Sequence, residues 1–215
     1  AKGIGVDTAE GGDNTSMCAV DDDGVIDLIS KKTPDTSEIP NMVLEFMKKW
    51  HCRPEDVVFD RGGGGYQHVS VLNKMGFKVR SVAFGETVTA ANHWKYFHTM
   101  KEKQMEAEEK TIYKNRRAEL YGTLRDVLNP AYETGFGIDT RFVELFQQLT
   151  PIPLWWEDGK LTLPPKSAKP GSKNPEDQIT LVKLIGHSPD EADSLVLAVY
   201  AMTHKPPNTM LGSMV

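Results

Sequence analysis

The chain opens on Gly3-Ile-Gly-Val-Asp7, an apolar run that stops on an aspartate and leads into the loop Thr8-Ala-Glu-Gly-Gly-Asp13. The same design returns at Val57-Val-Phe-Asp60, which is followed by Arg61 and four consecutive glycines. Short, continuously apolar runs bounded by turn residues are typical of buried strands. Because a buried carboxylate is costly without a partner, a strand that ends on Asp indicates a place where the charge has a use.

A third acidic group lies far along the chain, in Ser188-Pro-Asp190-Glu-Ala-Asp193-Ser-Leu. Pro189 predicts the start of a helix over 189–203, and the spacing puts Asp190 and Asp193 on one face of its first turn. Helix starts favour acidic residues in general, so this pair alone also fits an ordinary helix. Together with Asp7 and Asp60, however, it predicts a cluster of oxygen ligands for two divalent cations, Mg²⁺ or Mn²⁺.

The composition is that of an ordinary globular protein. With 215 residues, 39% of them hydrophobic and 26% charged, one domain with a sizeable core is expected. No apolar run approaches the length of a membrane span and no signal peptide opens the chain, so we expect neither membrane insertion nor secretion. The net charge of −5 does not indicate a nucleic-acid binder. Cys18 and Cys52 lack the spacing of a zinc site and are expected to be reduced thiols.

The pattern along the chain predicts an α/β fold. Strands are expected at 3–7, 16–20, 25–30, 56–60 and 78–84, with helices at 35–50 and 66–75 between the later ones. The second part is predicted to hold helices at 114–128, 139–149, 175–185 and 189–203, a β-hairpin at 151–156 and 160–163, and a loop rich in Pro, Gly and Lys at 164–173. The tail from 205 shows no periodicity and is expected to be flexible.

This order of strands and helices, with aspartates on the first and fourth strands and on a late helix, resembles the ribonuclease H-like nucleases. Further segments are similar to the nuclease domain of the large terminase subunit of tailed phages. They are Gly-Val-Asp7-Thr-Ala-Glu-Gly-Gly-Asp13, Phe-Asp60-Arg-Gly-Gly-Gly-Gly, Lys114-Asn-Arg-Arg-Ala-Glu-Leu-Tyr121 and Gly186-His-Ser-Pro-Asp190-Glu-Ala-Asp193. The resemblance covers nearly the whole chain, up to about His204.

The resemblance implies a ribonuclease H-like domain over 1–204, with a central mixed sheet flanked by helices, an added β-hairpin and a flexible tail at 205–215. It implies an endonuclease that cuts concatemeric viral DNA during genome packaging by two-metal phosphodiester hydrolysis. Asp7, Asp60 and Asp190 would be the catalytic metal ligands, and Asp193 a fourth ligand or a group behind them. Asp13 is expected to be a turn residue.

The same resemblance implies partners for the chain: double-stranded DNA, an ATPase motor, a portal and a small terminase subunit, all in the cytoplasm of the host cell. In the family the motor precedes the nuclease. No GxxxxGK[ST] motif occurs here, so we expect the motor to lie outside this chain.

DNA is held largely through its phosphates, which directs attention to the basic residues near the predicted site. Each of them also fits a salt bridge or a solvated loop. The candidates are Arg61, Arg116, Arg117, Lys166, Lys169, Lys173 and Lys183.

Three other functions remain open from the sequence. A resolvase or transposase core would use the same acidic triad. An actin-like phosphotransferase also has a strand ending in Gly-x-Asp, but it needs a duplicated half that 215 residues leave little room for. A non-catalytic DNA-docking module of a packaging motor would keep the acids for structural reasons.

Overall fold

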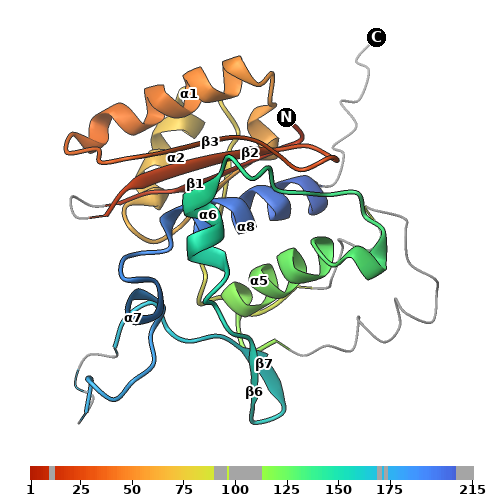
Figure 1. The fold of residues 1–215 in the computed structure, drawn as a ribbon. Helices are drawn as coiled ribbons and strands as arrows, with labels where there is room; N and C mark the ends of the chain where they lie inside the picture. The colour runs from red at the N-terminus through yellow and green to blue at the C-terminus, as the bar shows by residue number, and fades with distance from the viewer. Residues whose placement is uncertain (10–12, 90–95, 97–112, 169–170, 172–173, 207–215) are drawn as a thin grey trace.

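The computed structural model describes residues 1–9, 13–89, 96, 113–168, 171 and 174–206. In this part of the chain five strands form one mixed sheet in the order β3-β2-β1-β4-β5, and β6 and β7 form a separate hairpin (Figure 1). The strands are β1 (Gly3–Asp7), β2 (Thr15–Val20), β3 (Val25–Lys31), β4 (Val57–Asp60), β5 (Arg80–Val82), β6 (Trp155–Glu157) and β7 (Lys160–Thr162). The helices are α1 (Ile39–Lys49), α2 (Gly65–Lys74), α5 (Arg116–Val127), α6 (Val143–Leu149), α7 (Leu181–Ile185) and α8 (Asp190–Thr203).

The sheet is covered by helices on both faces, as Figure 1 shows, with α1 and α2 on one side and α8 on the other. Side chains alternate between the two faces of a strand. Ile4 and Val6 of β1 and Phe59 of β4 join the core under α1 and α2, whereas Val58 joins the core with α8. Asp7 lies three residues from Ile4 and therefore faces α8. The predicted central mixed sheet with flanking helices and an added hairpin is thus confirmed.

Helix α8 approaches β1 more closely than a side chain would allow. A Cβ on Gly5 would lie 2.0 Å from the backbone oxygen of Ser194, and one on Gly3 would lie 2.3 Å from that of Ala198. The two glycines on the α8 face of β1 therefore let helix and strand backbones touch. A hydrogen bond of 2.9 Å between the hydroxyls of Ser16 and Ser194 joins the helix to β2 as well.

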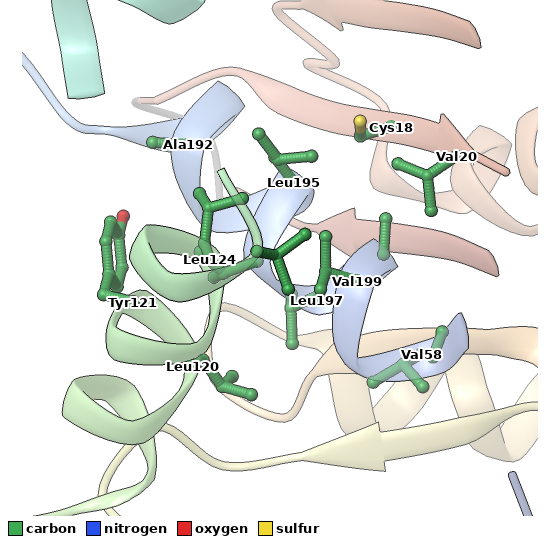
Figure 2. Packing of buried hydrophobic residues seen from close by; sticks show 14 of the residues in the cluster. Cys18, Val20, Val58, Leu120, Tyr121, Leu124, Ala192, Leu195, Leu197 and Val199 are labelled. Carbon is green, nitrogen blue, oxygen red and sulfur yellow. The ribbon is translucent and has the colours of Figure 1, made fainter. Parts of the chain in front are cut away.

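Helix α5 packs on the outer side of α8. Leu120 and Leu124 of α5 and Leu197 of α8 belong to the larger of the two cores, and Figure 2 shows Leu124 near Leu197. This layer fixes α8 between the sheet and α5, and so fixes the position of its first turn.

Several predicted elements are shorter than expected, among them the first strand of the hairpin, predicted at 151–156, which spans Trp155–Glu157. The predicted helix over 175–185 is helical only from Leu181, because the Thr180 side chain caps the helix there by accepting from the N–H of Lys183. The helix predicted from 139 begins at Val143, and the strand predicted at 78–84 pairs over Arg80–Val82.

At the start of the predicted tail, the Lys205 ammonium lies 2.6 Å from the Asp56 carboxylate. Residues 207–215 lie outside the described residues. Among the described residues no helix has the length and hydropathy needed to cross a bilayer.

Candidate functional site

The two aspartates at strand ends lie at the same edge of the sheet. Strands β1 and β4 run parallel, with Val6 paired to Phe59, so Asp7 and Asp60 follow side by side. Both line a cavity of about 210 Å³, together with Asp13 and Lys166. The loops behind them are tied together, because the Thr8 hydroxyl donates a hydrogen bond of 2.7 Å to the carbonyl of Gly63.

Asp7 is the most deeply buried carboxylate lining this cavity, with 4% of its surface exposed. Among the described residues no donor or ion pair reaches its oxygens at bonding distance. Burial raises the pKa of Asp7 well above its ordinary value, and the negative charge of Asp193 raises it further. Lys166 acts against this rise, while Asp60 and Asp190 add to it. Such a group is stabilised by any cation that enters the cavity.

Asp60 shares this environment in milder form. Burial is the main cause that raises its pKa, and the hydrogen bond from the Gly62 backbone acts in the opposite direction.

Asp190 reaches the site from the first turn of α8. Its Oδ2 accepts a hydrogen bond of 3.0 Å from the backbone N–H of Asn14, and the Ser188 hydroxyl donates to Oδ1. The Lys166 ammonium lies 3.6 Å from Asp190 Oδ1 and 3.6 Å from Asp13 Oδ2. Lys166 therefore stands between the glycine loop after β1 and the start of α8.

Burial alone would lower the pKa of Lys166. The charges of Asp7, Asp193 and Asp190 outweigh that effect and raise it. Lys166 is therefore a permanent cation among the carboxylates.

Asp193 is held from the other side, by α5. Arg117 Nη2 donates to both of its oxygens at 2.7 and 2.6 Å, and the Tyr121 hydroxyl donates at 2.7 Å. Burial raises the pKa of Tyr121, as does the adjacent Asp193. The negative charge of Asp193 raises the pKa of Asp7 and of Asp60, but both Asp193 oxygens already accept hydrogen bonds from α5.

The prediction that Arg116 and Arg117 contact DNA does not fit the structure. Both are buried: Arg117 is bound to Asp193, and Arg116 donates to the Thr87 carbonyl at 2.7 Å and lies 3.2 Å from Glu119.

Lys183 is also occupied, because its ammonium donates to the carbonyls of Pro175, Glu176 and Gln178. These bonds hold the turn before α7, and Lys183 is not among the residues that line the acidic cavity. Arg61 is partly exposed and pairs with Glu86 at 2.5 Å.

Lys166 alone of the predicted basic residues in the described part of the chain lines the acidic cavity. Lys169 and Lys173 lie outside the described residues. Sequence reasoning missed Gln148 of α6, whose side chain bonds to the first turn of α8. No local pattern marks it, since its partners are more than 40 residues away.

The donor set suits a hard divalent cation. Asp7, Asp60 and Asp190 offer carboxylate oxygens, which Mg²⁺ and Mn²⁺ prefer, and the buried Asp7 carboxylate lacks a donor from the described residues. Within those residues no three acidic, histidine or cysteine side chains already stand in the arrangement of a metal site. The residues fit such ions in the kind of ligand that they offer.

Comparison with known proteins gives structural relatives only. No family model and no curated protein matches the sequence. The fold matches the nuclease domain of the large terminase subunit gp2 of bacterial virus Sf6 with a TM-score of 0.58 and 18% identity, over 91% of this chain and 86% of that one.

A lysine-to-alanine variant of the Sf6 domain with manganese and beta-thujaplicinol matches with a TM-score of 0.60 at 18% identity, over the same shares of both chains. The same variant with calcium matches at 0.57 and 16%, again over 91% and 86%. The chain thus shares its fold with the Sf6 terminase nuclease domain.

Proposed function

We propose that this chain is a divalent-metal-dependent DNA endonuclease domain that cuts concatemeric viral DNA during genome packaging. One observation carries the proposal: Asp7 and Asp60 line one small cavity at the edge of the sheet, and Asp190 reaches its lysine from a third element. The shared fold with the Sf6 terminase nuclease supports the same interpretation, as do the manganese and calcium present with that relative.

In this proposal Asp7, Asp60 and Asp190 hold two Mg²⁺ or Mn²⁺ ions. Asp190 is preferred over Asp193 because its main cationic neighbour is a flexible lysine at 3.6 Å, whereas Arg117 and Tyr121 grip Asp193 at 2.6–2.7 Å. Asp193 adds negative charge from behind. When bound, such ions lower the pKa of an attacking water and stabilise charge on the leaving oxygen.

Lys166 and Arg61 are proposed to bind the DNA backbone next to the cut. The Lys166 ammonium already lies in the cavity, and Arg61 follows Asp60 directly with its guanidinium partly exposed. A phosphate could replace Glu86 as the partner of Arg61. With a net charge of −5, the isolated domain is expected to bind DNA weakly. The packaging motor, portal and small terminase subunit would bring DNA to it in the host cytoplasm.

The test is nicking of supercoiled plasmid with and without Mn²⁺, using wild type, Asp60→Asn and Asp7→Ala. Both variants should lose metal-dependent nicking while keeping the far-UV circular dichroism of the wild type. Asp23→Asn is the matched control, since Asp23 lies in the exposed β2–β3 turn at the opposite edge of the sheet. Full activity of Asp60→Asn would remove Asp60 from the site.

The same assay separates the alternatives. No nicking by the wild type with any divalent ion would favour a DNA-docking module. Preference for four-way junctions over linear duplex would favour a resolvase.

A further inference from the structure

Helix α8 begins without a side-chain cap of its own, although its first residue is Asp190. The first N–H groups of a helix find no partner inside the helix. Gln148 of α6 provides one from outside: its Oε1 accepts hydrogen bonds of 3.0 Å from the backbone N–H groups of both Glu191 and Ala192. The cap on the acid-bearing turn therefore comes from another helix.

The amide of Gln148 is held in one orientation. The side chain is 2% exposed, and its Nε2 donates a hydrogen bond of 3.2 Å to Glu144 Oε1, one turn earlier on α6. His187, just before α8, places its Nε2 2.9 Å from the same Glu144 oxygen. A flipped amide would set its NH₂ group against two N–H donors and its oxygen against a carboxylate. Glu144 therefore fixes the direction in which Gln148 presents its carbonyl.

The hydrogen bonds that Gln148 accepts hold the turn that carries Asp190. In the described part of the chain, the Asp190 carboxylate itself has as partners the Ser188 hydroxyl, the Asn14 backbone and the Lys166 ammonium. All three belong to segments outside the helices and strands, so they can follow a displaced carboxylate. The Gln148 amide, by contrast, is anchored within α6 and resists rotation or sliding of the first turn.

We propose that Gln148 is a positioning residue for the metal site: it caps α8 from α6 and thereby fixes Asp190 opposite Asp7. The inference rests on the proposed nuclease function. Metal ligands must be held within about 0.5 Å of their working geometry by the groups around them. Mutating groups bonded to metal ligands typically costs about 10- to 100-fold in metal affinity or activity, and we take the lower end for Gln148, which holds the turn and not the ligand itself.

The experiment measures Mn²⁺ binding by isothermal titration calorimetry and plasmid nicking on the full chain. Gln148→Asn draws the amide back by one methylene. It should raise the Mn²⁺ dissociation constant at least about tenfold and lower kcat by a similar factor, with KM for DNA unchanged. Gln147→Asn is the matched control, because Gln147 is exposed on the same helix, and it should behave as wild type.

A swap of the two polar groups provides the rescue. In the double variant Gln148→Glu with Glu144→Gln, the carboxylate at 148 still accepts from both N–H groups and the amide at 144 donates to it. The Mn²⁺ dissociation constant and kcat of this double variant should therefore lie within about threefold of wild type. Should Gln148→Asn not fold, Glu144→Ala removes the carboxylate that orients the amide, together with its contact to His187, and should weaken Mn²⁺ binding in the same direction.

The outcomes separate the two proposals. A wild type that binds Mn²⁺ and cuts, with a Gln148→Asn variant that melts lower but binds and cuts equally well, would overturn the positioning role alone. The same holds if a folded Glu144→Ala variant keeps wild-type affinity. A wild type that neither binds Mn²⁺ nor cuts would overturn the proposed function and this inference with it.

Discussion

The contact between β1 and α8 gives the sharpest test of how the fold builds the site. In Gly5→Ala the added Cβ would lie 2.0 Å from the Ser194 carbonyl oxygen and 2.4 Å from the Ala198 nitrogen. Both are backbone atoms of α8, so no rotamer change relieves the clash. Because ordinary contact begins near 3.4 Å, the helix must retreat by about 1.4 Å along this direction or tilt.

The retreat has two measurable costs. Overpacking in a core costs about 1–3 kcal/mol, and a backbone clash belongs at the upper end, which lowers Tm by about 6–12 °C for a chain of this size. The same shift moves Asp190 and Asp193 relative to Asp7, and a displacement of about 1 Å can cost about 100-fold in rate.

Thermal melts followed by circular dichroism, and nicking rates at 25 °C where the variant stays folded, measure the two effects separately. Gly85→Ala is the control, because a Cβ added at Gly85 would meet no atom of the described residues within 4 Å and the φ of Gly85 lies outside the left-handed region. A Gly5→Ala chain with wild-type Tm and wild-type nicking would refute the idea that this contact sets the site.

Other perturbations test the charges around the cavity. Lys166→Met removes the cation that opposes the rise in the pKa of Asp7. The Tm of this variant without metal should fall below that of wild type, and its increase in Tm on adding Mn²⁺ should be larger than that of wild type. Equal increases in Tm for the two proteins would contradict this. Tyr121→Phe deletes a buried donor to Asp193 and should destabilise the chain by about 1.5–3 kcal/mol in urea melts, with slower nicking; unchanged stability would speak against the bond. Burial, reinforced by the charge of Glu144, raises the pKa of Glu191 to about 7. Glu191 thus binds its proton more tightly in the folded than in the unfolded chain, so wild type should lose stability relative to Glu191→Gln as the pH rises from about 4.5 through 7. Thermal melts at pH 5 and pH 8 that show the same difference in Tm between wild type and variant would contradict this.

Much of the fold was predictable because the decisive signals are local. Alternation in Gly3–Asp7 and Val57–Asp60 places the aspartates on the face opposite Ile4, Val6 and Phe59, and parallel pairing brings the two strand ends together. The spacing of Asp190 and Asp193 needed only the helical period. Local patterns in the sequence therefore predict the sheet, the first and last helices and the acidic residues at the strand ends.

The orientation of the polar helix α5 could not be predicted in the same way. Arg116, Arg117, Glu119 and Asp126 are all buried, so its sequence shows no apolar stripe and its basic residues look like a DNA-binding surface. Their burial depends on partners elsewhere in the chain, such as Asp193, 76 residues from Arg117. A helix that buries its charges against remote partners gives no local sign of which face points inward.

The balance of charges around the cavity gives a test of whether the acidic cluster holds cations, as proposed, or serves a structural purpose. Four carboxylates, of Asp7, Asp60, Asp190 and Asp193, influence one another there. In the described residues, Arg117 balances Asp193 through direct bonds, and Lys166 supplies one further positive charge shared among the rest. These three carboxylates share one ammonium with Asp13, which lies 3.6 Å from Lys166, and so leave a deficit of positive charge in a buried setting, where unpaired charge is costly. A purely structural cluster would gain stability from replacing Asp7 by Asn, whereas a metal site needs the deficit that divalent ions fill. Asp7→Asn should therefore melt higher than wild type without metal and lower than wild type in Mn²⁺, and a variant that melts higher in both conditions would point to carboxylates that hold no ion.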